Sequence, residues 1–154
     1  MIHVRVVKKA DVPKAVRVIR AVFGKFLVQE HPKKISQWYL DFYDMKKNEK
    51  KIYDNFQKTT IKYFAEENGK AIGMIRGTPG RITNLYILGK HHRKGIGEKL
   101  LARFEKEAKR KGSKQINIRA SKFATKFYQK HEYKKTTGMR KFRGMNVQPM
   151  KKVL

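Results

Sequence analysis

The residues best suited to binding chemistry lie in one segment, 85–98, where an apolar run leads into a basic turn with two glycines. The turn, His92-Arg93-Lys94-Gly95-Ile96-Gly97, opens directly into an amphipathic helical pattern. The first four N–H groups of a helix lack internal acceptors, and the helix dipole adds about half a positive charge there. Glycine has no Cβ, so a ligand can approach the main chain closely. With its basic side chains the turn predicts a phosphate site, although the glycines alone also fit an ordinary strand-to-helix turn.

Several other kinds of site are disfavoured. The turn matches neither the Walker motif, which ends in Gly-Lys-Ser or Gly-Lys-Thr, nor the dinucleotide fingerprint with three spaced glycines. His91 and His92 are adjacent, so their side chains diverge, and no third ligand is spaced nearby. The chain has no cysteine, which excludes disulfides, thiolate zinc sites and a cysteinyl intermediate. We therefore expect no metal.

The pattern around the turn predicts the elements that must position it. Apolar alternation predicts strands over 2–6, 59–66, 70–76, 82–88, 115–120, 136–142 and 145–153. Helical spacing predicts helices over 12–24, 97–111 and 121–131, with one long or two shorter helices over 32–58. Asp11 is a predicted N-cap, Asn68-Gly69 a hairpin turn, and Gly112 a helix end. The predicted helix over 97–111 carries a basic outward stripe, Lys99, Arg103, Lys106 and Arg110.

Length and composition indicate one domain over residues 1–154. The N-terminus lacks a signal-peptide core, and no apolar run approaches the roughly 20 residues of a membrane helix. We expect a cytoplasmic protein without membrane contact, either a monomer or a homodimer. The net charge of +27 comes from 39 Lys and Arg against 12 Asp and Glu. This charge favours an acidic protein, RNA or the ribosome as a partner, or the lysines simply cover solvated faces.

The order of these elements resembles the GCN5-related N-acetyltransferase (GNAT) superfamily over almost the whole chain. The turn is similar to the family's pyrophosphate motif, with His92 where Arg or Gln is usual. The segment Ser121-Lys122-Phe123-Ala124-Thr125-Lys126-Phe127-Tyr128 looks like the family's later helix, with Ser121 in place of Asn. Glu132-Tyr133 stands where the family has Gly-Phe, and the ending 148–154 resembles its last strand. The resemblance implies a mixed, mostly antiparallel α/β (α+β) sheet with a splayed strand pair and helices on both faces.

The resemblance also implies a reaction, in which the amine of an acceptor attacks acetyl-CoA directly. Tyr128 matches the family's acid, which protonates the leaving thiolate. The implied acetyl-CoA contacts are Leu85, Tyr86 and Ile87 for the pantetheine arm, His92, Arg93, Lys94, Gly95, Ile96, Gly97 and Glu98 for the pyrophosphate, and Ser121. The alternative from another class is a polyanion- or nucleic-acid-binding protein that keeps the fold without catalysis.

Several roles stay open. Tyr128 is either the acid or a packing residue, and Ser121 either contacts the cofactor or is a plain N-cap. The strand over 81–88 contains no acid, so the sequence names no general base. The acceptor is equally open: a protein N-terminus or lysine, a small amine, or an aminoacyl-RNA. An aromatic cluster, Trp38, Tyr39, Phe42 and Tyr43, either holds an amine together with Asp41 and Asp44 or packs its helix on the sheet. We expect His31 and His131 at the surface.

Overall fold

A computed structural model describes residues 1–154, and its strands form one eight-stranded sheet. The strands are β1 (Ile2–Val6), β2 (Ile61–Glu67), β3 (Lys70–Thr78), β4 (Arg81–Ile87), β5 (Gln115–Ala120), β6 (Lys134–Lys135), β7 (Arg140–Phe142) and β8 (Met145–Val153). Their order is β1-β2-β3-β4-β5-β8-β6, and β7 pairs with β8. Every pair is antiparallel except β4 with β5. The mixed, mostly antiparallel sheet is therefore confirmed.

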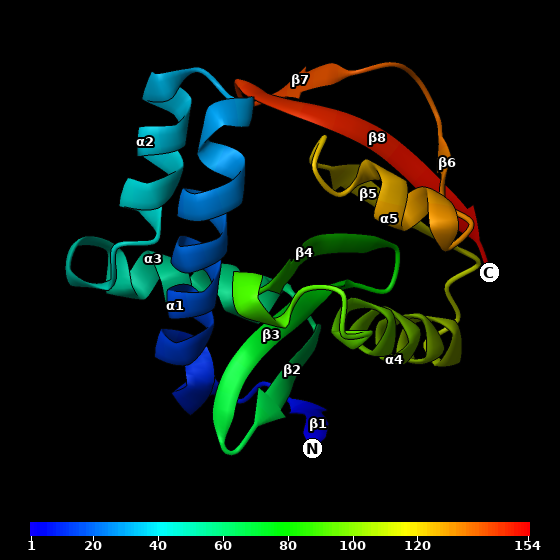
Figure 1. The fold of residues 1–154 in the computed structure, drawn as a ribbon, viewed down its shortest axis with the longest axis horizontal. Helices are drawn as coiled ribbons and strands as arrows, with labels where there is room; N and C mark the ends of the chain where they lie inside the picture. Colours follow the sequence, from blue (N-terminus) through cyan, green and yellow to red (C-terminus); the bar gives the residue numbers. More distant parts are fainter.

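Helices cover both faces of this sheet. They are α1 (Val12–Val22), α2 (Lys33–Phe42), α3 (Met45–Lys58), α4 (Ile96–Arg110) and α5 (Thr125–Lys130). Figure 1 shows α1, α2 and α3 on one side of strands β2–β4 and α4 on the other. Each side buries its own apolar cluster: Phe64 and Met74 face α1 and α3, whereas Ile75 and Ile82 pack with α4. None of the helices is long and apolar enough to cross a membrane.

Several local predictions are confirmed. The Asn68-Gly69 turn joins β2 to β3 with φ of 51° and 76°, the left-handed pair that a two-residue hairpin turn needs. Gly112 follows α4 with φ of 91°, as expected of a helix C-terminal glycine. The segment 32–58 forms two helices, α2 and α3, and Asp44 caps α3 by accepting a hydrogen bond from the Lys46 N–H at 2.9 Å.

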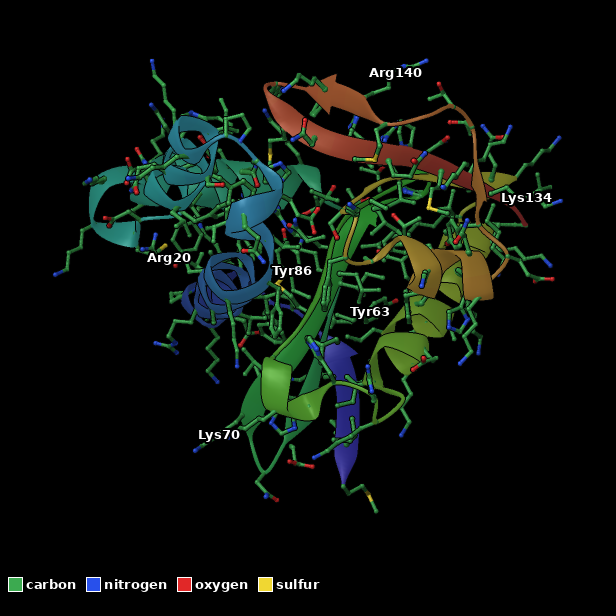
Figure 2. The ribbon with its side chains drawn as sticks, turned by 45° about the horizontal axis from the view of Figure 1, so that its top comes forward. Arg20, Tyr63, Lys70, Tyr86, Lys134 and Arg140 are labelled. Carbon is green, nitrogen blue, oxygen red and sulfur yellow. The ribbon has the colours of Figure 1, made fainter.

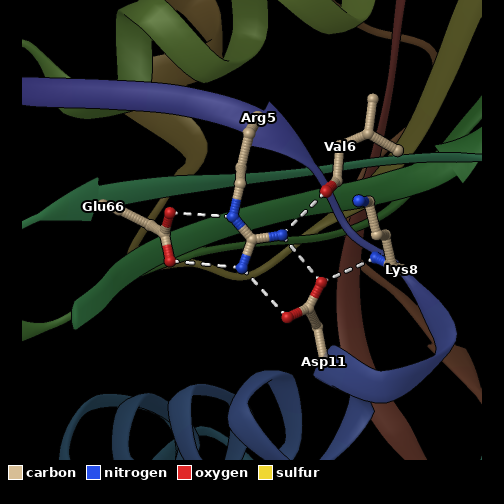
Figure 3. Close-up of polar contacts among 5 residues, drawn as sticks. All are labelled: Arg5, Val6, Lys8, Asp11 and Glu66. Atoms are coloured by element: carbon tan, nitrogen blue, oxygen red, sulfur yellow. Dashed lines mark hydrogen bonds and ion pairs between the residues drawn. The ribbon is translucent and has the colours of Figure 1, made fainter. Parts of the chain in front are cut away.

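Asp11 lies at the N-cap position of α1, as predicted, but its side chain accepts no hydrogen bond from that helix. Its carboxylate accepts hydrogen bonds from Arg5 at 2.7 and 2.9 Å and from the Lys8 N–H at 2.8 Å (Figure 3). Arg5 also donates to Glu66 at 2.8 and 3.2 Å. Because a guanidinium attracts a carboxylate more strongly than a helix N–H does, the ion pair determines where Asp11 points. The network joins β1, β2 and the start of α1.

Three predicted boundaries are wrong. The helix expected over 121–131 covers only Thr125–Lys130, because residues 121–124 form turns. The first helical segment does not end at Gly24 but continues through a π-helical turn, Phe23–Leu27. The strand expected over 136–142 is confined to β7, with β6 lying before it.

The strand pair β4–β5 opens because a bulge interrupts β4. Arg76 of β3 pairs with Asn84, but Gly77 pairs with Ile82, so Thr83 is the extra residue on β4. Such a bulge bends its strand and increases its twist. Strands β4 and β5 pair only through two positions, Arg81 with Asn117 and Ile82 with Ile118. The splayed strand pair is therefore present, and its opening begins at the bulge.

Candidate active site

Two adjoining cavities lie where β4 and β5 separate. The larger cavity, of about 330 Å³, extends toward α2 and the turn between β7 and β8. The smaller cavity, of about 240 Å³, extends along the glycine turn. The two share six lining residues: Leu27, Leu85, Tyr86, Ser121, Ala124 and Tyr128. A group bound in one cavity can therefore reach a group bound in the other at these residues.

The glycine turn presents a continuous set of free donors. None of the main-chain N–H groups from Arg93 to Glu98 donates to an acceptor within the protein; the first that does is Lys99, to the Gly95 carbonyl at 3.2 Å. Arg93 and Gly95 have φ of 63° and 75°, so the turn alternates through the left-handed region before α4 begins at Ile96. Consecutive N–H groups in such a conformation, at a helix N-terminus, form an anion-binding concavity. The turn thus fits a pyrophosphate.

The two glycines of the turn have different roles. Gly95 is needed for its positive φ. A Cβ on Gly97 would come within 3.1 Å of the Phe127 ring, so this glycine allows α4 to pack against α5. Phe127 lines the smaller cavity as well. The side chains of Arg93 and Lys94 are exposed, and Ile96 is buried in the core.

His92 bonds the end of β4. Its Nε2 lies 2.6 Å from the Ile87 carbonyl oxygen and, since a carbonyl only accepts, Nε2 carries the proton. The imidazole also packs against Phe26 and Phe123, with ring centroids 4.8 and 5.9 Å away. These three rings come from the π-helical turn, the glycine turn and the loop before α5. The three rings contact one another, and two of them, His92 and Phe123, line the smaller cavity.

The main chain of β4 is open toward the smaller cavity beyond the bulge. The Leu88 N–H donates to Ile72 of β3 at 2.9 Å, whereas the Ile87 carbonyl accepts from His92 on the opposite side. Because main-chain groups of successive strand residues alternate in direction, Leu85 and Ile87 present theirs to the cavity and Tyr86 presents its own to β3. Of Leu85, Tyr86 and Ile87, the first and last direct main-chain groups to the cavity, and the Ile87 carbonyl already accepts from His92.

Ser121 acts as a turn cap. Its Oγ accepts a hydrogen bond from the Ala124 N–H at 3.1 Å, and it lines both cavities. The next two N–H groups, of Lys122 and Phe123, donate to the Glu30 carboxylate at 2.7 and 2.9 Å. Glu30 precedes α2, so it joins the two sides of the opening across 92 residues of sequence. Nothing local in the sequence points to this contact.

Tyr128 lies at the junction of the two cavities. It is 3% exposed, and its ring packs edge-on against Phe127 and Tyr133, each with centroids 5.3 Å apart. Its hydroxyl makes no hydrogen bond within the protein. Burial, followed by the nearby Tyr86, raises the pKa of the Tyr128 phenol above its usual value. The hydroxyl therefore stays protonated at neutral pH and is free to donate a proton.

Tyr39, Tyr43 and Tyr86 form the wall of the larger cavity nearest α2, and the buried Arg76 bonds one of them. Tyr39 and Tyr86 share a hydrogen bond of 3.0 Å between hydroxyls, and Arg76 donates to Tyr43 at 2.7 Å and Asn84 at 2.8 Å. Figure 2 shows Tyr86 near the centre of the molecule. Burial raises the pKa of Tyr86 to about 12. Arg76 does not line the cavity itself but bonds two residues that do, and the sequence signal for it was an arginine inside an otherwise apolar strand.

The predicted amine-binding cluster is only partly present. Tyr39, Phe42 and Tyr43 line the larger cavity and Trp38 is half-exposed at its rim. The two acids do not line it. Asp44 caps α3, and Asp41 is exposed with its carboxylate beside Gln37 and Lys47.

His31 was expected at the surface but lines the larger cavity. Its Nδ1 accepts a hydrogen bond from the Asn146 N–H at 3.0 Å, and its ring stacks on Phe23. Burial lowers the pKa of His31, and the imidazole is neutral with its proton on Nε2. His131 is half-buried, 3.7 Å from Glu98. No group of three His, Asp or Glu side chains is arranged as metal ligands.

A mixed sheet that opens between β4 and β5, over a helix N-terminus with free donors, defines the acyl-CoA N-acyltransferase fold. The acetyltransferase (GNAT) domain family model matches residues 26–154, and the chain belongs to this family. No curated protein matches the chain significantly.

Solved structures agree with this fold. A GCN5-related N-acetyltransferase from Rhodopseudomonas palustris is 18% identical, with a TM-score of 0.84 over 99% of this chain and 95% of its own. The PaiA N-acetyltransferase from Thermoplasma acidophilum, solved with coenzyme A, is 19% identical, with a TM-score of 0.77 over 100% and 99% of the two chains. The ribosomal-protein-S18-alanine N-acetyltransferase from Escherichia coli is 16% identical, with a TM-score of 0.70 over 99% and 94%.

Proposed function

We propose that the chain is an N-acetyltransferase that moves an acetyl group from acetyl-CoA to a primary amine by direct attack. The observation that carries the proposal is the run of free N–H groups from Arg93 to Glu98 beside the open edge of β4. This arrangement suits a diphosphate followed by an arm that needs main-chain partners. Family membership and the coenzyme A complex of the Thermoplasma relative support it.

In this proposal the smaller cavity takes acetyl-CoA, which supplies an activated acetyl thioester. The turn from Arg93 to Glu98 would hold the pyrophosphate through its free N–H groups, with the Arg93 and Lys94 side chains adding charge. Leu85 and Ile87 offer main-chain partners to the arm, while Tyr86 contributes its ring to the wall. Ser121 lines the same passage, with its Oγ lone pair toward Ala124 and its hydroxyl proton free to donate.

The chain's own groups then supply a proton donor and an electrostatic environment. A main-chain N–H of β4 beyond the bulge would stabilise negative charge on the carbonyl oxygen. The protonated Tyr128 phenol, at the junction of the cavities, would donate its proton to the departing sulfur. The main-chain N–H belongs to a strand of the sheet and the Tyr128 ring is packed in the core, and such positioning lowers the cost of reaching the transition state.

No carboxylate lines the larger cavity, so the side that would receive the acceptor offers no acidic general base. His31 is also unsuited, because its Nδ1 is occupied by Asn146 and its Nε2 already carries a proton. We therefore propose that the amine enters neutral, or loses its proton to water.

Calorimetric titration with acetyl-CoA tests the cofactor half of this proposal, and an amine panel followed by free-thiol detection tests the transfer half. We expect saturable binding with one site per chain and thiol release that depends on the amine. Absence of binding to any acyl-CoA would refute the proposal.

A further inference from the structure

Three arginines converge on the larger cavity. Arg81 begins β4, Arg119 lies on β5, and Arg143 lies in the turn between β7 and β8. None of the three forms an ion pair with a carboxylate, and none of the chain's aspartates or glutamates lines this cavity. Among the other arginines of this chain, Arg5 and Arg110 form ion pairs with acids. The larger cavity therefore carries positive charge from its own lining residues, in addition to the net positive charge of the chain.

One aromatic ring brings two of the arginines together. The guanidinium carbon of Arg119 lies 3.7 Å from the centroid of the Phe142 ring, and that of Arg143 lies 5.1 Å from the same centroid. A guanidinium stacked on a ring keeps its N–H edge free for a planar or tetrahedral oxyanion. Burial, with repulsion from Arg81 and Arg143, lowers the pKa of Arg119.

The turn that carries Arg143 is held against the helical side of the cavity. Arg143 has φ of 52° and Gly144 of 83°, and a Cβ on Gly144 would come within 2.6 Å of Ile35 in α2. Two residues later, Asn146 bonds His31 through its N–H and Glu30 through its side chain, at 3.0 and 2.7 Å. Arg143 is therefore positioned by contacts with residues more than a hundred positions away. Like charges gathered this way are costly unless an anion joins them.

We propose that the acceptor is a primary amine that also carries a carboxylate or a phosphate, and that Arg81, Arg119 and Arg143 bind this oxyanion in the larger cavity. The inference rests on the proposed transferase function and names its substrate class. A cavity of about 330 Å³ suits a small molecule or one terminal residue of a peptide. The same charges disfavour polyamines and lysine-rich tails, and they favour the neutral form of a bound amine.

Matched acceptor pairs test the inference. The carboxylate pair is alanine and alaninamide, and the phosphate pair is O-phosphoethanolamine and ethanolamine. For each pair the selectivity is the ratio of kcat/KM for the anionic amine to that for its neutral partner, with each kcat/KM expressed per concentration of unprotonated amine because the two partners differ in amine pKa. We expect at least one ratio to be well above one, and the pair that shows it identifies the oxyanion.

Arginine variants then assign the contact. Arg119→Gln and Arg143→Gln should lower the preferred ratio roughly 10- to 100-fold through KM, because each removes a charge-assisted hydrogen bond. Arg119→Lys should recover part of it. The control Arg17→Gln removes an equal charge from the exposed face of α1 and should leave the ratio unchanged. A second readout is calorimetry without acetyl-CoA, in which N-acetylalanine should bind more tightly than its amide and lose this advantage in Arg119→Gln.

Two results would overturn the inference. Equal or better transfer to both neutral amines, with acetyl-CoA binding intact, would leave the proposed function standing and remove the oxyanion site. Equal losses for anionic and neutral amines in the arginine variants would show that these arginines only support the fold. Failure to bind acetyl-CoA would instead refute the proposed function itself, and the inference with it.

Discussion

Tyr128→Phe is the substitution that tests the mechanism most sharply. The Tyr128 hydroxyl has no hydrogen-bond partner in the protein, so its removal leaves no buried group unpaired, and the ring keeps its contacts with Phe127 and Tyr133. We therefore expect the free energy of unfolding to change by less than about 1 kcal/mol. Affinity for acetyl-CoA should also be unchanged, because the lost group acts on the departing sulfur.

The expected effect on the rate follows from the environment of the phenol. A positioned general acid contributes roughly 10²- to 10⁴-fold. Burial raises the pKa of Tyr128 above that of a free phenol, which widens its gap from a thiol of pKa about 8.5 and weakens it as a donor. We therefore expect kcat to fall toward the lower end, by about 100-fold, which corresponds to about 2.7 kcal/mol of activation free energy.

The assay is stopped-time or continuous detection of free thiol, with acetylated amine quantified by mass spectrometry. Tyr133→Phe is the matched control, since Tyr133 is buried in the same cluster but donates to Glu105 at 2.7 Å. That variant should lose about 1–3 kcal/mol of stability and keep its kcat. An unchanged kcat in Tyr128→Phe would remove Tyr128 from the acid role.

Three further predictions concern the cofactor turn, the ion-pair network and the surface charge. Gly97→Leu should weaken acetyl-CoA binding in calorimetry, because its side chain displaces Phe127 from the smaller cavity; unaltered affinity would contradict this. Arg5 lowers the pKa of Asp11 to about 2. The folded state is therefore stabilised by the Arg5–Asp11 pair above the ordinary aspartate pKa near 4, and this stabilisation is lost as pH falls toward 2. Arg5→Met should lower stability at pH 7 by roughly 1–3 kcal/mol and flatten this acid dependence in urea titrations, and an unaltered pH profile would refute the assignment. If the charge of +27 serves RNA, co-purified RNA should be released steeply by added salt, whereas salt-insensitive retention would argue against electrostatic binding.

The sequence was most informative where function depends on local main-chain geometry. The Gly95 and Gly97 spacing, placed between a strand and a helix, was enough to predict the turn. The helical spacing from Ser121 predicted a helix there but overestimated the length of α5, and Tyr128 was singled out by the resemblance to the GNAT family rather than by spacing. Glu132 stands where the GNAT family usually has glycine. Its φ is 72°, in the left-handed region that glycine favours.

The acceptor side was much harder to predict, because tertiary contacts assemble it. Arg143 lies in a turn that packs on Ile35, and His31 is held beside the cavity by Asn146 and Phe23. Asp41 and Asp44 do not line the larger cavity, because local contacts hold their carboxylates elsewhere. Each carboxylate has a nearer partner within or beside its own helix, and sequence proximity to aromatic residues does not reveal that competition.

The central claim is that the opening between β4 and β5 binds acetyl-CoA on the free N–H groups of the glycine turn and passes its acetyl group to an amine. The most direct measurement combines calorimetric titration of the protein with acetyl-CoA and stoichiometric counting of free thiol and acetylated amine. The account predicts one saturable site per chain, and one thiol released for each amine acetylated. No saturable binding, or thiol release without an acetylated amine, would contradict it.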